Sequence, residues 1–412
     1  MKKQIFAYVL FSLAFLFSCS DENLISSNSS NGKYIAKSQK FNNRIDMKEA
    51  MSQVEEAIAF LDKEHPSESK SIRAVNSVSI LRFGDVKSSI MKSKEYAALD
   101  ISDTLAYVFN FGDSSGFAII SNDVRIESPL LAFAEKGSLV NGETDNPGLK
   151  LFLERLEGYM LESIAKYGKA GEEKAMGIGD YFTRPTPLDT IVRPLVPVKW
   201  GQAKPFNNNL AYGNCPNTGN GKYPAGCVAT AVAQIMSYWE YPPNMGGIGY
   251  NWKRLNFFKD SSYFEALPTD DIIASTAKGF ARAMVADLFQ RISTSININF
   301  YCKGSGAYPS TALAFLASKG FSTQNLKPYD LSTVRDGLLL KRPFMATGCP
   351  NEGKCHTWVI DGLAKNSNNS YYIHNNWGVN NGFYDSYSLS GVFRKASDTS
   401  SYNNVEIAAV YR

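Results

Sequence analysis

The chain has 412 residues, 44% of them hydrophobic, which is enough for two or three compact domains that each bury a core. Its 43 basic and 39 acidic residues give a formal charge of +4 and are spread along the chain without a dense block of lysine or arginine. Nucleic-acid binding needs such a block to follow the phosphates, so nucleic acid is not an expected partner.

The amino terminus has the pattern of a cleavable signal peptide over residues 1–18. Two lysines precede an apolar run over 5–17, which is too short to span a bilayer, so no transmembrane span is predicted. The run ends in Leu-Phe-Ser-Cys and resembles a bacterial lipobox, in which the cysteine becomes the lipidated first residue of the exported protein. Cys19 is therefore the predicted lipidation site, the alternative being a plain signal peptide with an incidental cysteine. The Ser/Asn-rich residues 19–34 then form a flexible tether.

Residues 35–170 form the first predicted domain, a compact α+β unit. Apolar residues recur every three or four positions along 45–61, which predicts an amphipathic helix, and Asp46 and Glu49 have the spacing of a capping box. This domain holds one histidine and no cysteine, so it has few residues with which to do chemistry. Its other predicted elements are strands over 105–111, 117–120 and 130–133 and a helix over 149–166.

Glycine and proline punctuate residues 171–197, which are predicted to hold no long helix or strand. We interpret this segment, which contains Arg184 and Arg193, as a linker to a second domain over 198–412. An exposed connection of this kind is a preferred site of proteolytic processing.

Cys227 starts a predicted helix in the second domain, with apolar residues along one stripe and an end before Pro242. A thiol at a helix amino terminus meets the positive end of the helix dipole, which lowers its pKa and favours the nucleophilic thiolate. Gly226 leaves room for a substrate to approach. The competing interpretation is a buried structural cysteine at a helix start.

The chain has only three histidines, so the search for a partner base is short. His356 lies in a strand-like run 129 residues after Cys227, and Asn376 lies 149 residues after it. Papain-like enzymes place their His and Asn about 130 to 150 residues after the Cys. In this scheme His356 takes the thiol proton and later protonates the leaving amine, Asn376 orients the imidazole, and Trp377 shields that contact from water.

Three further patterns bear on this assignment. The side-chain amide of Gln202 would join the Cys227 N–H in stabilising the tetrahedral oxyanion. His374 is a minor alternative base, since it competes with the better placed His356. The Gly-Asp-Ser-Ser-Gly run at 112–116 matches a serine-hydrolase pattern, but no helix follows it and no histidine is near in the chain, so it is predicted as a hairpin turn.

Without Cys19 the exported chain keeps five cysteines, and an odd number in an oxidising compartment implies at least one free thiol. Cys349 and Cys355 have the spacing of a small disulfide loop beside His356, whereas the sequence leaves open whether Cys215 and Cys302 pair or stay reduced. There is no C-x-x-C pair, so a structural zinc site is not expected, and no metal or organic cofactor is implied.

Four runs in order resemble the streptopain-like cysteine peptidases. The amino-terminal half is similar to the propeptide of the same family, notably in Tyr-Val-Phe-Asn-Phe-Gly at 107–112. The four runs are Trp-Gly-Gln-x-x-Pro-Phe-Asn at 200–207, Gly-Cys-Val-Ala-Thr-Ala-Val-Ala-Gln-Ile-Met at 226–236, His-x-Trp-Val-Ile-Asp-Gly at 356–362 and His-x-Asn-Trp-Gly at 374–378.

The resemblance implies a papain-like α+β peptidase domain, with a helical part and an antiparallel sheet, preceded by an α+β propeptide domain. It implies a zymogen that cleaves proteins with an apolar residue two places before the scissile bond, and it equates the family's Cys and His with Cys227 and His356. Two departures affect the groove wall. Lys354-Cys355 replaces the family's Gly-Gly before the His, and Val-Asn-Asn at 379–381 replaces a Trp and glycines after the Asn-Trp-Gly.

The predicted function is that of a secreted cysteine endopeptidase made as a zymogen, with protein and peptide substrates and its own propeptide as inhibitor. The precursor is expected as a lipoprotein at the outer membrane or cell surface, with the mature enzyme released by processing. The alternatives are a Cys/His/Asn acyl transferase or amidase, and an inactive surface binding protein, on the same scaffold.

Overall fold

The computed structural model describes residues 43–64, 73–84, 99–169, 187–264, 272–350, 353–379, 382–394 and 404–412. The predicted signal peptide, Cys19, the tether, His65 and Arg184 lie outside these described residues. Within the described ranges, no helix combines the length and the hydrophobicity needed to cross a membrane.

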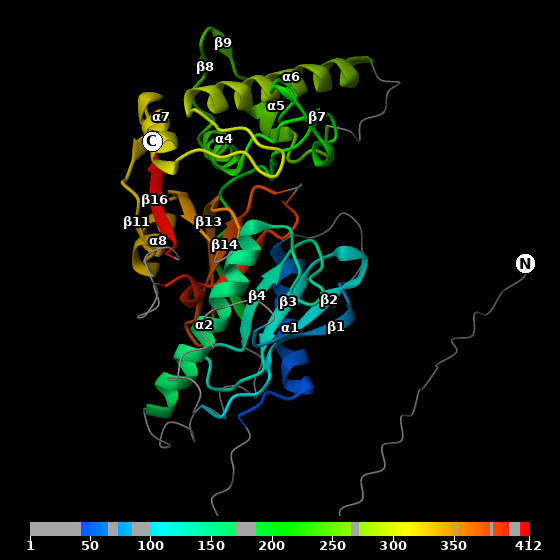
Figure 1. The fold of residues 1–412 in the computed structure, drawn as a ribbon, viewed down its shortest axis with the longest axis vertical. Helices are drawn as coiled ribbons and strands as arrows, with labels where there is room; N and C mark the ends of the chain where they lie inside the picture. The colour runs from blue at the N-terminus through cyan, green and yellow to red at the C-terminus, as the bar shows by residue number, and fades with distance from the viewer. Residues whose placement is uncertain are drawn as a thin grey trace, which may run out of the picture. The chain divides into compact units, whose positions relative to one another are not determined.

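The amino-terminal elements agree with the predicted helices and strands. The capping box forms as expected, because the Asp46 N–H donates to Glu49 Oε2 at 3.2 Å and the Glu49 N–H donates to Asp46 Oδ1 at 2.8 Å. Figure 1 shows α1 lying along the sheet of β1 to β4. The elements are α1 (Met47–Glu64), β1 (Val75–Arg82), β2 (Thr104–Phe111), β3 (Phe117–Ser121), β4 (Leu130–Ala134) and α2 (Pro147–Lys169).

The run at 112–116 is the predicted turn between two antiparallel strands. A short 3-10 segment, η2 (Gly112–Ser114), joins β2 to β3, and Asp113 has a φ of 54°. Gly116 is required at the end of the turn, because a Cβ there would lie 2.1 Å from the Ala134 carbonyl oxygen.

The carboxyl-terminal part supplies a second set of antiparallel strands and most of the helices. Figure 1 shows α4 packed beside α5 and α6. The strands are β5 (Leu188–Val192), β6 (Tyr212–Cys215), β7 (Gly221–Lys222), β8 (Asn244–Met245), β9 (Ile248–Gly249), β10 (Ser322–Thr323), β11 (Lys327–Pro328), β12 (Phe344–Gly348), β13 (His356–Asn366), β14 (Tyr371–Asn376), β15 (Ser386–Leu389) and β16 (Glu406–Tyr411). The helices are α4 (Cys227–Trp239), α5 (Trp252–Phe257), α6 (Ile272–Ser295), α7 (Pro309–Ser318) and α8 (Leu331–Leu339), with 3-10 segments η4 (Pro216–Thr218) and η6 (Ser390–Phe393).

A single sheet runs through both parts in the order β1-β2-β3-β4-β15-β14-β13-β12-β16-β10, with β5 paired to β13 and β11 to β16. The junction is the antiparallel pair β4 and β15, in which Phe133 lies opposite Tyr387. Their rings stack with centroids 5.2 Å apart. The amino-terminal part is therefore joined to the carboxyl-terminal part by main-chain hydrogen bonds as well as by side chains.

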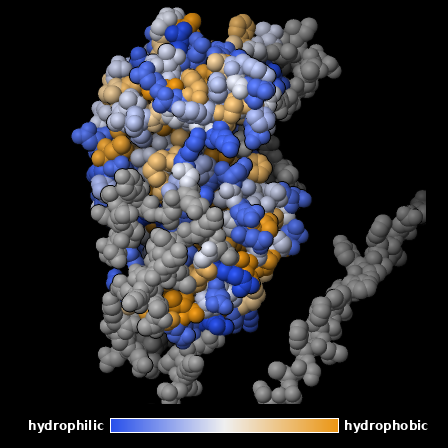
Figure 2. Space-filling view, viewed as in Figure 1, coloured by the Kyte–Doolittle hydropathy of each residue, from blue (hydrophilic) through white to orange (hydrophobic). Residues whose placement is uncertain are grey.

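Two hydrophobic cores form on this framework. The first combines α1, α2 and β2 to β4 with residues of β13 to β15, so it is shared by both predicted domains. The second lies between α4, α6 and α7 and residues of β12, β13 and β16. Between the cores runs β13, whose first residue is His356. On the surface, hydrophilic and hydrophobic residues are interspersed over the described face in Figure 2.

Candidate active site

Cys227 is the first residue of α4, as predicted, and its exposure is intermediate. The preceding Gly226 has a φ of 87°, a conformation that favours glycine. A Cβ on Gly226 would also lie 2.7 Å from the Ser305 carbonyl oxygen. The glycine is thus required by the backbone turn and by close packing.

Burial raises the pKa of the Cys227 thiol, whereas hydrogen bonds from Thr357 and from the N–H groups at the start of α4 act in the opposite direction. The N–H groups of the helix terminus thus act in the expected direction, but burial outweighs them and the pKa of the thiol is raised in the precursor. The contact with Thr357 is informative, since this residue follows His356 directly in β13. The nucleophile and base candidates are thus brought together by α4 and β13.

His356 is buried, and its Nε2 lies 2.9 Å from the Trp377 carbonyl oxygen. A carbonyl can only accept, so Nε2 carries the proton and Nδ1 keeps its lone pair in the neutral ring. Burial lowers the pKa of His356 to about 4. At neutral pH the precursor therefore holds an uncharged imidazole, and the ring lies parallel to Trp358 with centroids 6.1 Å apart.

Asn376 does not orient His356 in this arrangement. Its Oδ1 accepts from Gln234 Nε2 at 2.8 Å, and its Nδ2 donates to the Val198 carbonyl at 2.9 Å. The predicted orienting contact is made instead by the backbone carbonyl of Trp377. Oδ1 also accepts the Gly378 N–H at 3.3 Å, so both of its lone pairs are engaged, which explains why the amide does not turn toward the imidazole.

The other two predicted site residues lie close to the candidate pair. The Gln202 carbonyl accepts the Ala225 N–H at 2.8 Å, which fixes Gln202 to the segment just before Cys227. Trp377 is fully buried, and its ring centroid lies 6.5 Å from that of His356. Both residues therefore flank the site, although it is the Trp377 carbonyl, rather than its ring alone, that contacts the base.

The first turn of α2 lies against Trp377. Asn146 caps this helix by accepting the N–H groups of Gly148 and Leu149 at 2.9 and 3.0 Å. A Cβ on Gly148 would lie 2.1 Å from Trp377 Cε3, so only glycine fits there. The Asn-Pro-Gly sequence predicts a helix start. That this helix start covers the site is evident only from the folded chain.

The cysteines pair as the sequence allowed. Cys349 and Cys355 form the small loop beside His356, and Cys215 pairs with Cys302. Among the cysteines that the structure describes, Cys227 alone is free. Four of the five cysteines after Cys19 therefore form disulfides, and the fifth, Cys227 at the start of α4, keeps its thiol.

The minor alternative base, His374, takes part in a different contact set. Its Nδ1 lies 2.6 Å from Asp361 Oδ1, and its Nε2 lies 3.5 Å from Glu135 Oε1. These carboxylates raise the pKa of His374 to about 10 despite its burial, so the ring stays charged and is not available as a base at neutral pH.

Two protein-family models match parts of the chain. Residues 200–388 match the Peptidase C10 family, and residues 42–160 match the Spi protease inhibitor family. The chain is 25% identical over 306 residues to the thiol protease/hemagglutinin PrtT of Porphyromonas gingivalis, a match that covers 69% of this chain but only 33% of PrtT. It is 24% identical over 319 residues to streptopain of Streptococcus pyogenes, covering 69% of this chain and 74% of streptopain.

A solved structure of a prointerpain A fragment from Prevotella intermedia has the same fold. The TM-score is 0.51 at 19% identity, and the match covers 80% of this chain and 98% of that fragment. The predicted fold class, a papain-like α+β peptidase domain after an α+β propeptide, is therefore confirmed. The chain is therefore homologous to streptopain and carries a Peptidase C10 domain preceded by a Spi-type inhibitor domain, the organisation of a zymogen.

Proposed function

We propose that Cys227 is the nucleophile and His356 the general acid and base of the endopeptidase made from this zymogen. One observation carries the assignment. The single free cysteine of the described chain starts a helix and contacts Thr357, the neighbour of His356. Protein and peptide substrates are the expected substrate class, with the inhibitor domain as the internal inhibitor.

The chemistry follows from the positions of the protons. His356 Nδ1 accepts the Cys227 thiol proton while Nε2–H stays bonded to an oxygen acceptor. The thiolate adds to the scissile carbonyl, and the oxyanion is stabilised by the Cys227 N–H and, in our proposal, by the Gln202 amide. The imidazolium then gives its proton to the leaving amine, which leaves a thioester that water hydrolyses with His356 as base.

The inhibitor domain keeps this pair uncharged in the precursor. Its helix α2 covers Trp377, and burial disfavours both the thiolate and the imidazolium. Once the domain leaves, water reaches the site and the ionised pair becomes accessible. In the mature enzyme the Trp377 carbonyl continues to orient His356, and Asn376 keeps the partners that it has in the precursor.

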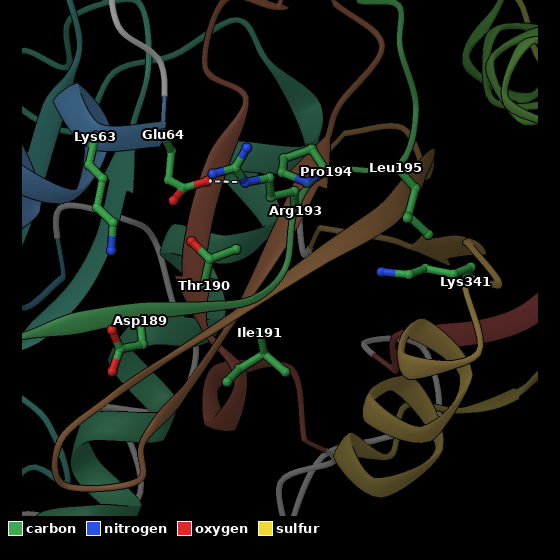
Figure 3. Close-up of a pocket in the computed structure, with 9 residues that line it drawn as sticks. All are labelled: Lys63, Glu64, Asp189, Thr190, Ile191, Arg193, Pro194, Leu195 and Lys341. Atoms are coloured by element: carbon green, nitrogen blue, oxygen red, sulfur yellow. Dashed lines mark ion pairs between the residues drawn. The ribbon is translucent and has the colours of Figure 1, made fainter.

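Processing in the linker predicted over 171–197 would separate the two domains. Its end is already ordered, because β5 pairs with β13 and the ends of β5, Leu188 and Val192, are buried. Figure 3 shows that Arg193 reaches Glu64 at the end of α1, with Nε and Oε2 2.9 Å apart, beside a cavity of about 540 Å³. A cut ahead of β5 leaves this strand in the mature sheet, and departure of the inhibitor domain then breaks the ion pair between Arg193 and Glu64.

We further propose that the precursor is an exported lipoprotein at the outer membrane or cell surface. The lipobox-like run ending in Cys19 supports this placement, and both disulfides are typical of an oxidising compartment. Cys19→Ser should abolish incorporation of radiolabelled palmitate. Equal labelling of the variant would disprove the anchor without affecting the peptidase assignment.

The direct test compares the chain from Ser20 onward with its Cys227→Ala and His356→Ala variants on a denatured protein substrate under reducing conditions. Cleavage sensitive to an epoxide-type inhibitor and lost in both variants is expected, together with failure of purified Cys227→Ala to trim itself. Cys349→Ala with Cys355→Ala is the matched cysteine control. Full cleavage by Cys227→Ala would refute the assignment.

A further inference from the structure

A buried set of charged side chains lies where the inhibitor domain joins the peptidase sheet. Glu135, next to β4, pairs through Oε2 with Lys199 Nζ and lies 3.5 Å from His374 through Oε1. His374 in turn contacts Asp361 at 2.6 Å. The set is completed by Asp385, which has no solvent exposure, and whose carbonyl accepts the Glu135 N–H at 3.2 Å.

Asp385 is connected to the candidate base through one residue. Its Oδ1 accepts the Trp377 N–H at 2.9 Å, and the carbonyl of Trp377 accepts from His356 Nε2 at 2.9 Å. Trp377 makes both bonds through its backbone, its N–H to Asp385 and its carbonyl to His356. Movement of Asp385 therefore moves the residue on which the His356 hydrogen bond depends.

The second oxygen of Asp385 lacks a partner. Oδ2 is buried and accepts no hydrogen bond. Lys199 is nearby, because a Cβ on Gly382 would lie 2.4 Å from Lys199 Cδ and 2.9 Å from Asp385 Oδ2. The ammonium of Lys199 is nonetheless bound to Glu135. Burying a carboxylate oxygen that has no hydrogen bond costs free energy, and a bond from the nearby Lys199 ammonium to Asp385 Oδ2 would remove that cost.

The balance of buried charges also favours a change of partner by Lys199. With the inhibitor domain in place, three carboxylates face two cations, the ammonium of Lys199 and the imidazolium of His374. One of the three carboxylates, Glu135, belongs to the inhibitor domain. When that domain leaves, two carboxylates and two cations remain, and Lys199 is released from its present partner.

We propose that Asp385 is a positioning residue for His356 that acts through the backbone of Trp377. In the mature enzyme, after Glu135 has left, Lys199 pairs with Asp385 Oδ2 and so fixes this backbone. The proposal rests on the assignment of His356 as the base. It gives the inhibitor domain an electrostatic link to the site in addition to the steric cover that α2 supplies.

The test uses enzyme matured in trans by wild-type protease, with three variants. Asp385→Ala removes the acceptor and the charge, Asp385→Asn keeps an acceptor oxygen, and Asp361→Asn is a matched control because Asp361 is equally buried in the same cluster but has no bond to Trp377. We expect kcat to fall by about 10- to 100-fold in Asp385→Ala and by less in Asp385→Asn, with KM changed by no more than about twofold. Asp361→Asn should lower the melting temperature and leave kcat within about twofold.

The pH dependence of kcat/KM separates positioning from general destabilisation. The acid limb, which reports the imidazole of the free enzyme, should shift in Asp385→Ala and stay in place in Asp361→Asn. Lys199→Met should reproduce the kcat loss in the mature enzyme. Wild-type kcat and an unshifted acid limb in folded Asp385→Asn and Lys199→Met would overturn the proposal, whereas an inactive wild type would instead refute the proposed function.

Discussion

Gly148 of the inhibitor domain touches the Trp377 indole so closely that a Cβ on Gly148 would lie 2.1 Å from Cε3. Both residues are buried. The backbone carbonyl of the same Trp377 accepts the hydrogen bond from His356 Nε2. The contact therefore joins the cover of the site to the residue that orients the base.

This contact predicts that Gly148→Leu weakens inhibition. The added side chain cannot fit against the buried indole, so the first turn of α2 must move away from Trp377. We expect the uncleaved precursor to react faster with iodoacetamide at Cys227, by about tenfold, which corresponds to about 1.4 kcal/mol of lost docking energy. Gly279→Ala in α6 is the control, because no atom lies within 4 Å of a Cβ there. Equal labelling of Gly148→Leu and wild type would show that α2 does not limit access.

Acid should destabilise the precursor through His356. Its pKa falls from 6.5 to about 4 on burial, so the folded state binds this proton less readily than the unfolded chain. Stability is therefore lost as pH falls from about 6.5 toward 4, by up to roughly 3 kcal/mol from this group. Urea unfolding of Cys227→Ala precursor at about pH 7 and pH 4.5 measures the loss, and adding His356→Gln should reduce it. An unchanged pH slope in the double variant would contradict the burial of a neutral imidazole.

The loss of precursor stability at alkaline pH should depend on His374 instead. Its pKa is raised from 6.5 to about 10, so its contribution is fully present below about pH 6.5 and is lost as pH rises through 10. Replacing Glu135 by Gln removes one of the two carboxylates that hold the imidazolium. We expect Glu135→Gln precursor to lose stability at a lower pH than wild type in an alkaline unfolding series. Coincident curves would show that Glu135 does not hold the charge on His374.

The two disulfides should differ in their effect on stability. Cys215 and Cys302 are 87 residues apart, whereas Cys349 and Cys355 are 6 apart. Loop-closure entropy assigns roughly 4–5 kcal/mol to the long loop and about 2 kcal/mol to the short one. Urea unfolding of the Cys215→Ala/Cys302→Ala and Cys349→Ala/Cys355→Ala double variants tests this order. A larger loss from the short loop would indicate that local geometry beside His356, rather than chain entropy, dominates.

The mature enzyme should retain β5. This strand pairs with β13 from Leu188 to Val192, and its loss would remove two buried side chains from the core and leave that side of β13 unpaired. Amino-terminal sequencing of the processed enzyme is expected to give a start ahead of Leu188. A truncated enzyme that starts at Arg193 should unfold at a lower temperature than one that starts at Pro187. An active, stable product that begins after Val192 would contradict this role.

The sequence by itself determined the local structures and singled out the candidate reacting residues. Periodicity predicted α1 and α2, the β-prone runs predicted β2 to β4, and the stripe after Cys227 predicted α4, because these patterns depend on neighbours within one or two turns. The count of three histidines and the spacing from Cys227 singled out His356 as candidate, and the odd number of cysteines predicted a free thiol.

Only the tertiary structure decided how these residues are held. The replacement of Asn376 by the Trp377 carbonyl, the raised pKa of Cys227, and the link from Asp385 to Trp377 all depend on burial and on contacts between distant segments. No local pattern marks Glu135 or Gly148 either, since each acquires its role only when β4 pairs with β15 and α2 covers the indole. Local propensity is set by neighbouring residues, whereas solvation and hydrogen-bond choice are set by which segments exclude water from one another.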